Sequence, residues 1–257
     1  MKYKFIDKDT NYKDKIKTGI IKLPIDYTNI IDKTLNEAKT IFREDLKCII
    51  LGGSCGKNIP VVNWSDIDLY IILDKYEIKK VKKFTEYIKN SLIHIGTTFY
   101  TEKEIKKNLI DERTKVMLYE KQKLNVNPTI YGSFKFKRIK YRAIKKNDRN
   151  NLPKALHEFR RMHIKLLDKN SIVEKKYIKK LILVLKCYFN IKGKFLYGYL
   201  NVINEFLMVY NEKENKSTKE YFFDIIDALS DVQNNKKKII DLGNRILDFM
   251  EKEMEWL

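Results

Sequence analysis

Gly52-Gly53-Ser54 follows the apolar run Cys48–Leu51, and Ser65-Asp66-Ile67-Asp68-Leu69 leads into a second apolar run, Tyr70–Leu73. The runs predict two buried strands, because short apolar segments bounded by turn residues are typical of sheet interiors. The glycines then fall at the end of the first strand, where a backbone without Cβ atoms can turn sharply and approach a phosphate closely. This order of elements predicts a phosphate-binding loop, with the Ser54 hydroxyl offered to a phosphate oxygen.

Asp66 and Asp68 are separated by one residue on the second predicted strand. Side chains at i and i+2 of a strand project from the same face, so both carboxylates point into one site while Ile67 and Leu69 point into the core. Two neighbouring carboxylates repel each other, and a divalent cation with oxygen ligands, usually Mg²⁺, relieves that repulsion. Two such ions, about 3.5–4 Å apart, would clamp the attacking and leaving oxygens of a phosphoryl displacement.

The glycine-glycine-serine loop, the spacer and the Asp-x-Asp strand together resemble the signature of the polymerase β type nucleotidyltransferase superfamily. The resemblance implies an α/β fold and transfer of a nucleoside monophosphate from an NTP to an acceptor hydroxyl, with release of pyrophosphate. It also implies that Asp66 and Asp68 are the catalytic ligands of Mg²⁺, with two ions possible. The nucleotide-binding residues that it implies are Gly52, Gly53, Ser54, Lys57 and Ser65.

The third carboxylate that this family usually supplies is missing from the strand expected over residues 92–100, which contains no acid. Alignment of the following helix start with similar family members places Gly96 at the third carboxylate's position and His94 two residues earlier on the same face. His94 is a candidate general base, because a neutral imidazole titrates near physiological pH, but a lone histidine on a strand is more often a packed structural residue.

Three acids further along the chain are other candidates for the third carboxylate: Glu102, Glu104 and Asp111. Glu102 and Glu104 fall in the expected first turn of a helix after Thr101, where the helix dipole alone favours acids. We therefore expect a structural role for these two glutamates. The open choice is between a third ligand from elsewhere and a site that binds nucleotide and metal but turns over poorly.

Composition favours a folded, soluble, cytoplasmic protein. The chain has 257 residues and 44% hydrophobic residues, enough for a sizeable core. No apolar run reaches the length of a membrane span, and the start of the chain lacks the apolar segment of a signal peptide. Three scattered cysteines favour neither a disulfide framework nor a zinc site, and Cys55 is expected to be a small residue in a tight turn.

The formal charge of +19 predicts an anionic partner, with RNA or DNA as the first candidate. An AT-rich coding sequence would also enrich lysine without selection for binding. The charge argues against a cationic antibiotic as the acceptor.

Aromatic or apolar residues alternate with basic residues over 134–146, which suits either stacking on a nucleic-acid strand or a basic edge strand. Arg113 and Lys115 are candidates for a phosphate path or for a solvated helix face.

The coarse pattern predicts two domains: an α/β nucleotidyltransferase domain with a mixed sheet over residues 1–146, and a C-terminal α-helical bundle over 147–257. A polar linker, 147–151, opens the second domain, and Pro153 suits a first helical turn. Apolar spacing of three and four predicts helices at 29–43, 77–90, 104–120, 152–167, 172–189, 195–210, 221–232 and 239–254. His157, Arg160, Arg161 and His163 are expected at the interface of the domains.

Three hypotheses follow. The first is a metal-dependent nucleotidyltransferase whose acceptor is RNA, a protein or a small molecule. The second is a turnover-impaired module of the same fold that binds nucleotide or nucleic acid. The third is an antibiotic nucleotidyltransferase. The sequence leaves the oligomeric state open.

Overall fold

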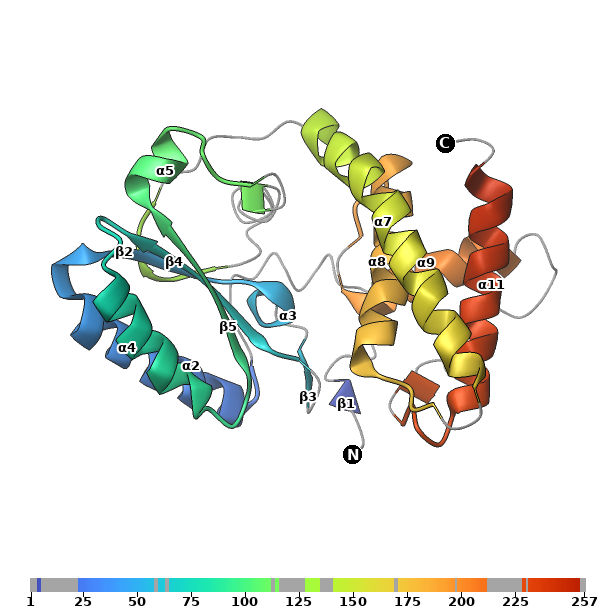
Figure 1. Ribbon diagram of the computed structural model, residues 1–257, viewed down its shortest axis with the longest axis horizontal. Helices are drawn as coiled ribbons and strands as arrows, with labels where there is room; N and C mark the ends of the chain where they lie inside the picture. Colours follow the sequence, from blue (N-terminus) through green and yellow to red (C-terminus); the bar gives the residue numbers. More distant parts are fainter. Residues whose placement is uncertain are drawn as a thin grey trace. The chain divides into compact units, whose positions relative to one another are not determined.

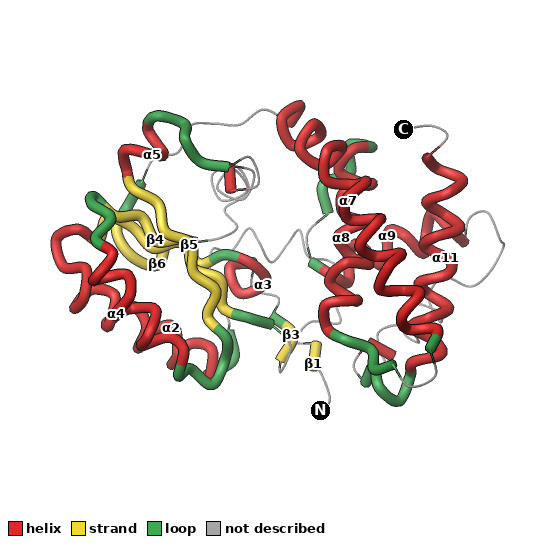
Figure 2. Tube along the Cα trace, viewed as in Figure 1, coloured by secondary structure: helices red, strands yellow, loops and turns green. Residues whose placement is uncertain are grey.

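The computed structural model describes residues 4–5, 23–57, 60–62, 65–111, 114–115, 128–134, 141–168, 171–196, 198–211, 228–229 and 231–254. The chain divides into two compact units, residues 11–140 and residues 1–10 together with 141–257. The first unit holds the four-stranded sheet and is α/β, and the second is built mainly of helices (Figure 2). The predicted fold class, a mixed α/β domain followed by helices, is confirmed.

The α/β unit contains α2 (Ile25–Phe42), a 3₁₀ turn (Arg43–Asp45), β2 (Leu46–Leu51), α3 (Gly53–Gly56), β3 (Val61–Val62), β4 (Ile67–Leu73), α4 (Ile78–Lys89), β5 (Ile95–Thr101), α5 (Glu102–Lys106) and β6 (Thr129–Gly132). The remaining elements are β1 (Lys4–Phe5), α7 (Tyr141–Leu167), α8 (Lys175–Ile191), α9 (Tyr199–Asn211) and α11 (Lys236–Met254). No helix in the described parts of the chain is long and apolar enough to span a membrane.

The sheet has the strand order β5-β4-β2-β6. β4 and β5 are parallel and are joined through α4, whereas β2 runs antiparallel to both β4 and β6, so the sheet is mixed. The register places Leu51 opposite Leu69 and Asp68 beside Gly96. This register brings the end of β2, the start of β4 and the start of β5 together at the same end of the sheet.

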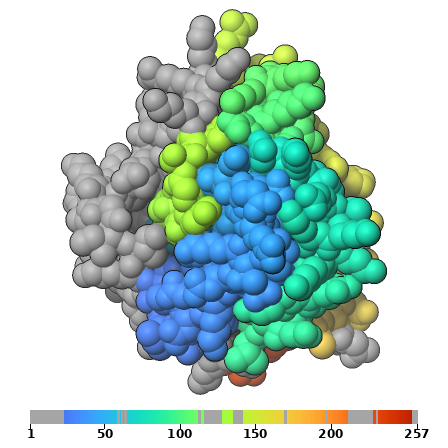
Figure 3. Space-filling model, turned by 90° about the vertical axis from the view of Figure 1, so that its left-hand side faces the viewer, coloured from blue at the N-terminus to red at the C-terminus, as the bar shows by residue number. Residues whose placement is uncertain are grey.

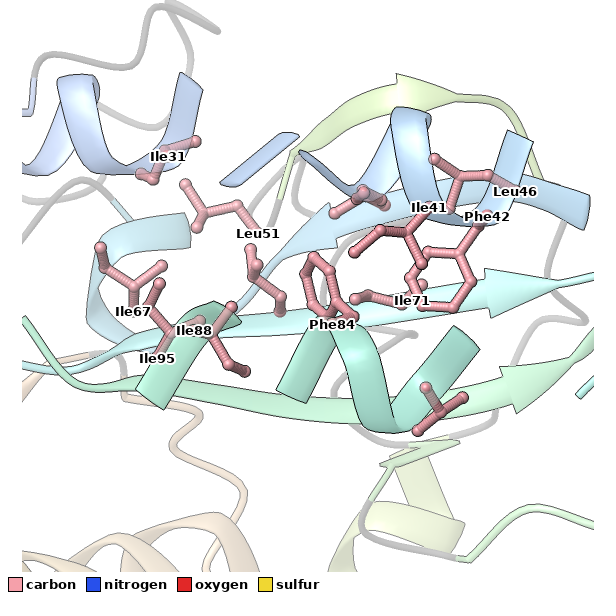
Figure 4. Close-up of a cluster of buried hydrophobic side chains, with 14 of the residues drawn as sticks. Ile31, Ile41, Phe42, Leu46, Leu51, Ile67, Ile71, Phe84, Ile88 and Ile95 are labelled. Carbon is pink, nitrogen blue, oxygen red and sulfur yellow. The ribbon is translucent and has the colours of Figure 1, made fainter. Parts of the chain in front are cut away.

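Helices α2 and α4 cover one face of the sheet, as Figure 1 shows. Alternate residues of β4 point into this layer: Ile71 lies beside Phe84 of α4, and Ile67 lies near Ile88 of the same helix (Figure 4). Phe84 is fully buried, and its ring lies 5.3 Å from that of Phe42. The two helices adjoin at the surface of the unit in Figure 3, in blue and teal. Because Ile67 and Ile71 face this core, the side chain of Asp68 lies on the opposite face of β4.

The opposite face of the sheet carries a smaller cluster. Its buried members are Cys48, Ile50, Tyr70, Ile72, Ile105 and Ile110. The ring of Phe134 packs against this cluster, which explains the first aromatic residue of the stretch 134–146. Asp68 precedes Tyr70 and Ile72 on the same face, because side chains two residues apart share a face of a strand.

The predicted linker at 147–151 is wrong, because these residues lie inside α7. Residues 141–146 also lie inside α7, so the basic edge strand, one of the two interpretations of 134–146, does not form there. The helix continues because Ile144, Asp148 and Leu152 are buried at a spacing of four. Because a polar residue, Asp148, occupies a core position, the apolar spacing of the helix is interrupted there and the segment looks like a linker. Pro153 is also inside α7 rather than in its first turn, and it is exposed. The two compact units divide between residues 140 and 141.

The single helix predicted over 104–120 is also wrong. α5 begins at Glu102 and ends at Lys106, and Asn108 has a left-handed backbone with φ of 61°. Asparagine tolerates that conformation and commonly ends helices. Residues 114–115 are helical again, whereas Arg113 and residues 116–127 lie outside the described ranges.

The helical unit is tied together by a buried polar contact among three helices. His163 of α7 contacts the Tyr177 hydroxyl through Nδ1 (2.7 Å) and the Asn244 side-chain oxygen through Nε2 (2.8 Å). Tyr177 belongs to α8 and Asn244 to α11. Because both ring nitrogens of His163 have partners and the residue is 4% exposed, His163 has a structural role.

Candidate active site

The glycine loop approaches β4 as closely as its lack of side chains allows. Gly53 has φ of 59°, and a Cβ atom there would lie 2.0 Å from Oδ2 of Asp68. A Cβ atom on Gly52 would lie 2.5 Å from Cε2 of Tyr70. Both positions therefore require glycine, for close approach at Gly52 and for close approach and backbone conformation at Gly53. The structure brings the predicted loop and the predicted metal ligand into contact.

The loop is also joined to β4 through the main chain. The Gly52 amide donates a hydrogen bond to the Asp68 carbonyl oxygen (2.7 Å), and the Gly56 amide donates to the Gly52 carbonyl (2.8 Å), which closes the turn of α3. Ser54 lies in this turn and is partly exposed. Lys57 follows directly as the C-cap residue of α3. The loop is thus a short helical turn whose main chain is anchored beside Asp68.

Asp66 and Asp68 are both partly exposed, whereas Ile67 between them is fully buried. This alternation follows from the pleat of the strand, as the sequence predicted. Ser65 is only 6% exposed, and its carbonyl oxygen accepts a hydrogen bond from the Tyr27 hydroxyl (3.0 Å). The role of Ser65 in nucleotide binding stays a prediction.

Two buried side chains that the sequence did not single out as functional lie beneath the aspartates. The Cys55 thiol donates to the Asp66 carbonyl oxygen (3.4 Å), next to the bond from Tyr27 to Ser65. Burial, followed by the negative charges of Asp68 and Asp66, raises the pKa of the Cys55 thiol to about 12. Burial, followed by Cys55 and Asp66, raises the pKa of Tyr27 to about 12. Both groups are therefore protonated donors at neutral pH.

Gly96, where the resemblance places the third carboxylate, pairs with Asp68 in the register of β4 and β5. A Cβ atom on Gly96 would lie 3.1 Å from Oδ1 of Asp68, so even an alanine would be tight. His94 is exposed just before β5, and its carbonyl oxygen accepts a hydrogen bond from the Ile67 amide (2.9 Å). That bond fixes the main chain of His94 beside the site and leaves its role as a base a prediction.

The structural roles expected for Glu102 and Glu104 fit the structure. Glu104 closes a capping box with Thr101: its carboxylate accepts from the Thr101 amide (2.6 Å) and hydroxyl (2.7 Å), and the Glu104 amide donates to the Thr101 hydroxyl. Glu102 forms an ion pair with Lys106 one turn later. Both arrangements stabilise the start of α5.

Asp111 is engaged as well. Its carboxylate accepts hydrogen bonds from the Tyr100 hydroxyl (2.8 Å) and the Thr114 amide (2.9 Å). Burial opposes ionisation of Asp111, but the hydrogen bonds from Thr114 and Tyr100 outweigh it and lower the pKa of the carboxyl. These contacts anchor the segment after α5 to β5.

The donor set suits Mg²⁺ bound together with a nucleotide. Among the residues that the structure describes, no group of three or more His, Cys, Asp or Glu side chains could hold a metal ion. Mg²⁺ commonly takes one or two carboxylates and completes its shell with substrate phosphates and water. Asp66 and Asp68, both partly exposed beside the glycine loop, are carboxylates of this kind.

The other residues singled out from the sequence belong to other elements of the chain or fall outside the described ranges. Lys115 is partly buried, and residues 135–140 are outside the described ranges. In the helical unit, His157 and Arg160 are exposed on α7. Arg161 lines a cavity of about 420 Å³ together with Lys165 and Lys176, at the end of α7 and the start of α8.

A solved structure with a similar fold is the crystal structure of spectinomycin adenyltransferase AAD(9) from Enterococcus faecialis with ATP and spectinomycin. The sequence identity is 12% and the TM-score is 0.53, and the match covers 84% of this chain and 99% of that chain. The likeness shows that the chain has the fold of a nucleotidyltransferase. No protein-family model and no curated protein sequence matches the chain.

Proposed function

We propose that this protein is a Mg²⁺-dependent nucleotidyltransferase that moves a nucleoside monophosphate from an NTP to an acceptor hydroxyl. The observation that carries the proposal is the contact between Gly53 and the Asp68 carboxylate. It supports a site in which a phosphate-binding turn and an aspartate pair act on the same substrate atoms.

Each element has a role in the proposed reaction. The main chain of Gly53, the Ser54 hydroxyl and the Lys57 ammonium bind the β- and γ-phosphates. Asp66 and Asp68 hold Mg²⁺, which supplies electrostatic stabilisation of the charge that develops on the phosphate oxygens. The acceptor oxygen forms a bond to the α-phosphorus, the bond from the α-phosphorus to the bridging oxygen breaks, pyrophosphate leaves, and the hydroxyl proton passes to water or to His94.

Four observations bear on the alternatives. The glycine at position 96 favours the turnover-impaired module, because it offers no third oxygen ligand beside Asp68. The similar fold of an adenyltransferase solved with ATP and spectinomycin favours a small-molecule acceptor, including an antibiotic. Against a cationic acceptor, Glu102, Glu104 and Asp111 are all engaged in contacts of their own unit. The charge of +19 keeps RNA among the candidate acceptors.

The test is transfer of label from each of four α-³²P-labelled NTPs, in the presence of Mg²⁺, to total RNA, to a protein extract and to spectinomycin. We expect label on one acceptor class, and the class identifies the acceptor. If the folded protein binds nucleotide and RNA but labels nothing with any NTP, the proposal fails and the non-catalytic module replaces it.

A further inference from the structure

The segment that carries both aspartates is held at each of its four residues, 65–68, by contacts from α2, from the glycine loop and from the residue before β5. Ser65 accepts from the Tyr27 hydroxyl, and Asp66 accepts from the Cys55 thiol through its main-chain oxygen. The Ile67 amide donates to the carbonyl of His94, and the Asp68 carbonyl accepts from the amide of Gly52. Two of these four contacts come from side chains and therefore depend on residue identity.

We propose that Tyr27 and Cys55 are positioning residues of the metal site, which hold the Asp66–Asp68 segment at a fixed distance from the glycine loop. The inference rests on the proposed function, since it assigns these residues to the binding of Mg²⁺ and nucleotide. Neither side chain touches substrate in this account. They act through the main chain of the residues that do.

The positions of Tyr27 and Cys55 in the fold explain how they could hold the aspartate segment in place. Tyr27 is 2% exposed on α2, within the apolar cluster between that helix and the sheet. Cys55 is fully buried in α3, the turn that forms the glycine loop. Tyr27 thus joins the aspartate segment to the core, and Cys55 joins it to the glycine loop. Movement of the segment relative to the core breaks the Tyr27 contact, and movement of the loop relative to the segment breaks the Cys55 contact.

The two contacts differ in strength. A hydroxyl that donates to a carbonyl makes an ordinary hydrogen bond, whereas a thiol is a weak donor. Removal of the Tyr27 hydroxyl also leaves the oxygen of a buried residue, Ser65, without that donor. We therefore expect Tyr27→Phe to have the larger effect, and Cys55→Ser, which keeps a donor, to have less effect than Cys55→Ala.

The first measurement is the affinity of the full chain for Mn²⁺ in the presence of α,β-methylene-ATP, read from the electron paramagnetic resonance of free Mn²⁺. Loss of one buried hydrogen bond predicts that Tyr27→Phe weakens Mn²⁺ binding by about fivefold to tenfold. The matched control is Tyr87→Phe on α4, where the ring is 39% exposed, and its affinity should equal that of the unmutated protein. Equal affinity in Tyr27→Phe and the unmutated protein overturns the inference.

The second measurement separates positioning from general stability. The cysteines Cys48, Cys55 and Cys187 are all buried, so their rates of alkylation by iodoacetamide report on three places in one experiment. Tyr27→Phe should speed alkylation of Cys55 by about fivefold, since local opening is coupled to loss of the neighbouring bond, with Cys48 and Cys187 unchanged. A parallel rise at all three cysteines means that Tyr27 only stabilises the fold and overturns the inference.

The outcomes also distinguish this inference from the proposed function. An unmutated protein that binds Mn²⁺ and nucleotide but transfers no label contradicts the enzymatic proposal, and the comparison with Tyr27→Phe still decides the positioning role. An unmutated protein that transfers label while Tyr27→Phe binds Mn²⁺ equally well contradicts the positioning role alone. Failure of the unmutated protein to bind Mn²⁺ with the nucleotide analogue overturns both.

Discussion

The carboxylate of Asp68 lies against Gly53 so closely that a single methyl group on the glycine would overlap Oδ2. The contact joins residues from two strand ends, and the bond from the Gly52 amide to the Asp68 carbonyl reinforces it. In the proposed function, these contacts hold the loop that would bind phosphate directly beside the aspartate that would bind metal. The predictions below test this arrangement and the scaffold that maintains it.

Gly53→Ala should reduce nucleotide affinity by at least about tenfold, because the new Cβ atom meets Asp68 and φ of 59° is strained for alanine. Gly96→Ala is the matched control, since its Cβ atom would lie 3.1 Å from the same carboxylate and its backbone has an ordinary conformation. We expect a smaller loss there. Calorimetric titration with ATP and Mg²⁺ measures both, and equal affinities of the two variants and the unmutated protein would contradict the contact.

Gly96→Asp should destabilise the protein without metal by about 1–2 kcal/mol, because like charges placed side by side on neighbouring strands repel. Mg²⁺ should recover more stability in this variant than in the unmutated protein, since a third oxygen ligand is then available. Thermal unfolding with and without Mg²⁺ measures the difference. An identical response of both proteins to Mg²⁺ would show that position 96 does not adjoin the metal.

Asp148→Asn should stabilise the helical unit at pH 7 by about 1 kcal/mol. Burial raises the pKa of the Asp148 carboxyl despite the hydrogen bond from Asn190, so ionisation costs stability at every pH above the unfolded pKa of about 3.9.

The sign of this effect is set by linkage. A raised pKa in the folded state means that folding favours the protonated acid, so the penalty is absent below the unfolded pKa and grows as pH rises through the folded pKa. The gain of Asp148→Asn should therefore shrink when urea unfolding is repeated near pH 4. Destabilisation of the variant at pH 7 would contradict this account of the buried acid.

Gly243→Ala should destabilise the protein by about 1–3 kcal/mol through overpacking, although alanine favours helices by about 1 kcal/mol over glycine. A Cβ atom at this position of α11 would lie 2.1 Å from the Tyr177 hydroxyl and 2.7 Å from Nδ1 of His163. The steric term decides the sign because both neighbours are buried and hydrogen-bonded to each other. Chemical denaturation measures the change, and a more stable variant would show that the three helices are less tightly packed.

The sequence predicted the parts of the fold that repeat a local pattern. The strand alternation of Ile67, Asp68 and Leu69 and the helical spacing of α4 both depend on periods that a chain shows within ten residues. The loop and the aspartate pair could be found for the same reason. Their contact in space follows from the register of β2 with β4, which places Leu51 opposite Leu69.

The remaining features depend on partners far along the chain. The polar run at 147–151 forms a helix because Asp148 binds Asn190, a partner 42 residues away. The bond from Tyr27 to Ser65 spans 38 residues, and neither residue type marks the contact in advance. The break after α5 is local, since Asn108 adopts a left-handed backbone, and this signal was present in the sequence.

The most direct test of the central claim compares pyrophosphate release from NTP and acceptor in three proteins: the unmutated chain, Asp68→Asn and Asp74→Asn. Asp74 follows the far end of β4 and is exposed, so its substitution controls for loss of one carboxylate from the same strand. Our account predicts that Asp68→Asn lowers turnover by about a thousandfold or more, with folding retained, because transition-state charge is no longer stabilised, while Asp74→Asn is unaffected. Equal turnover in the unmutated protein and in Asp68→Asn would contradict it.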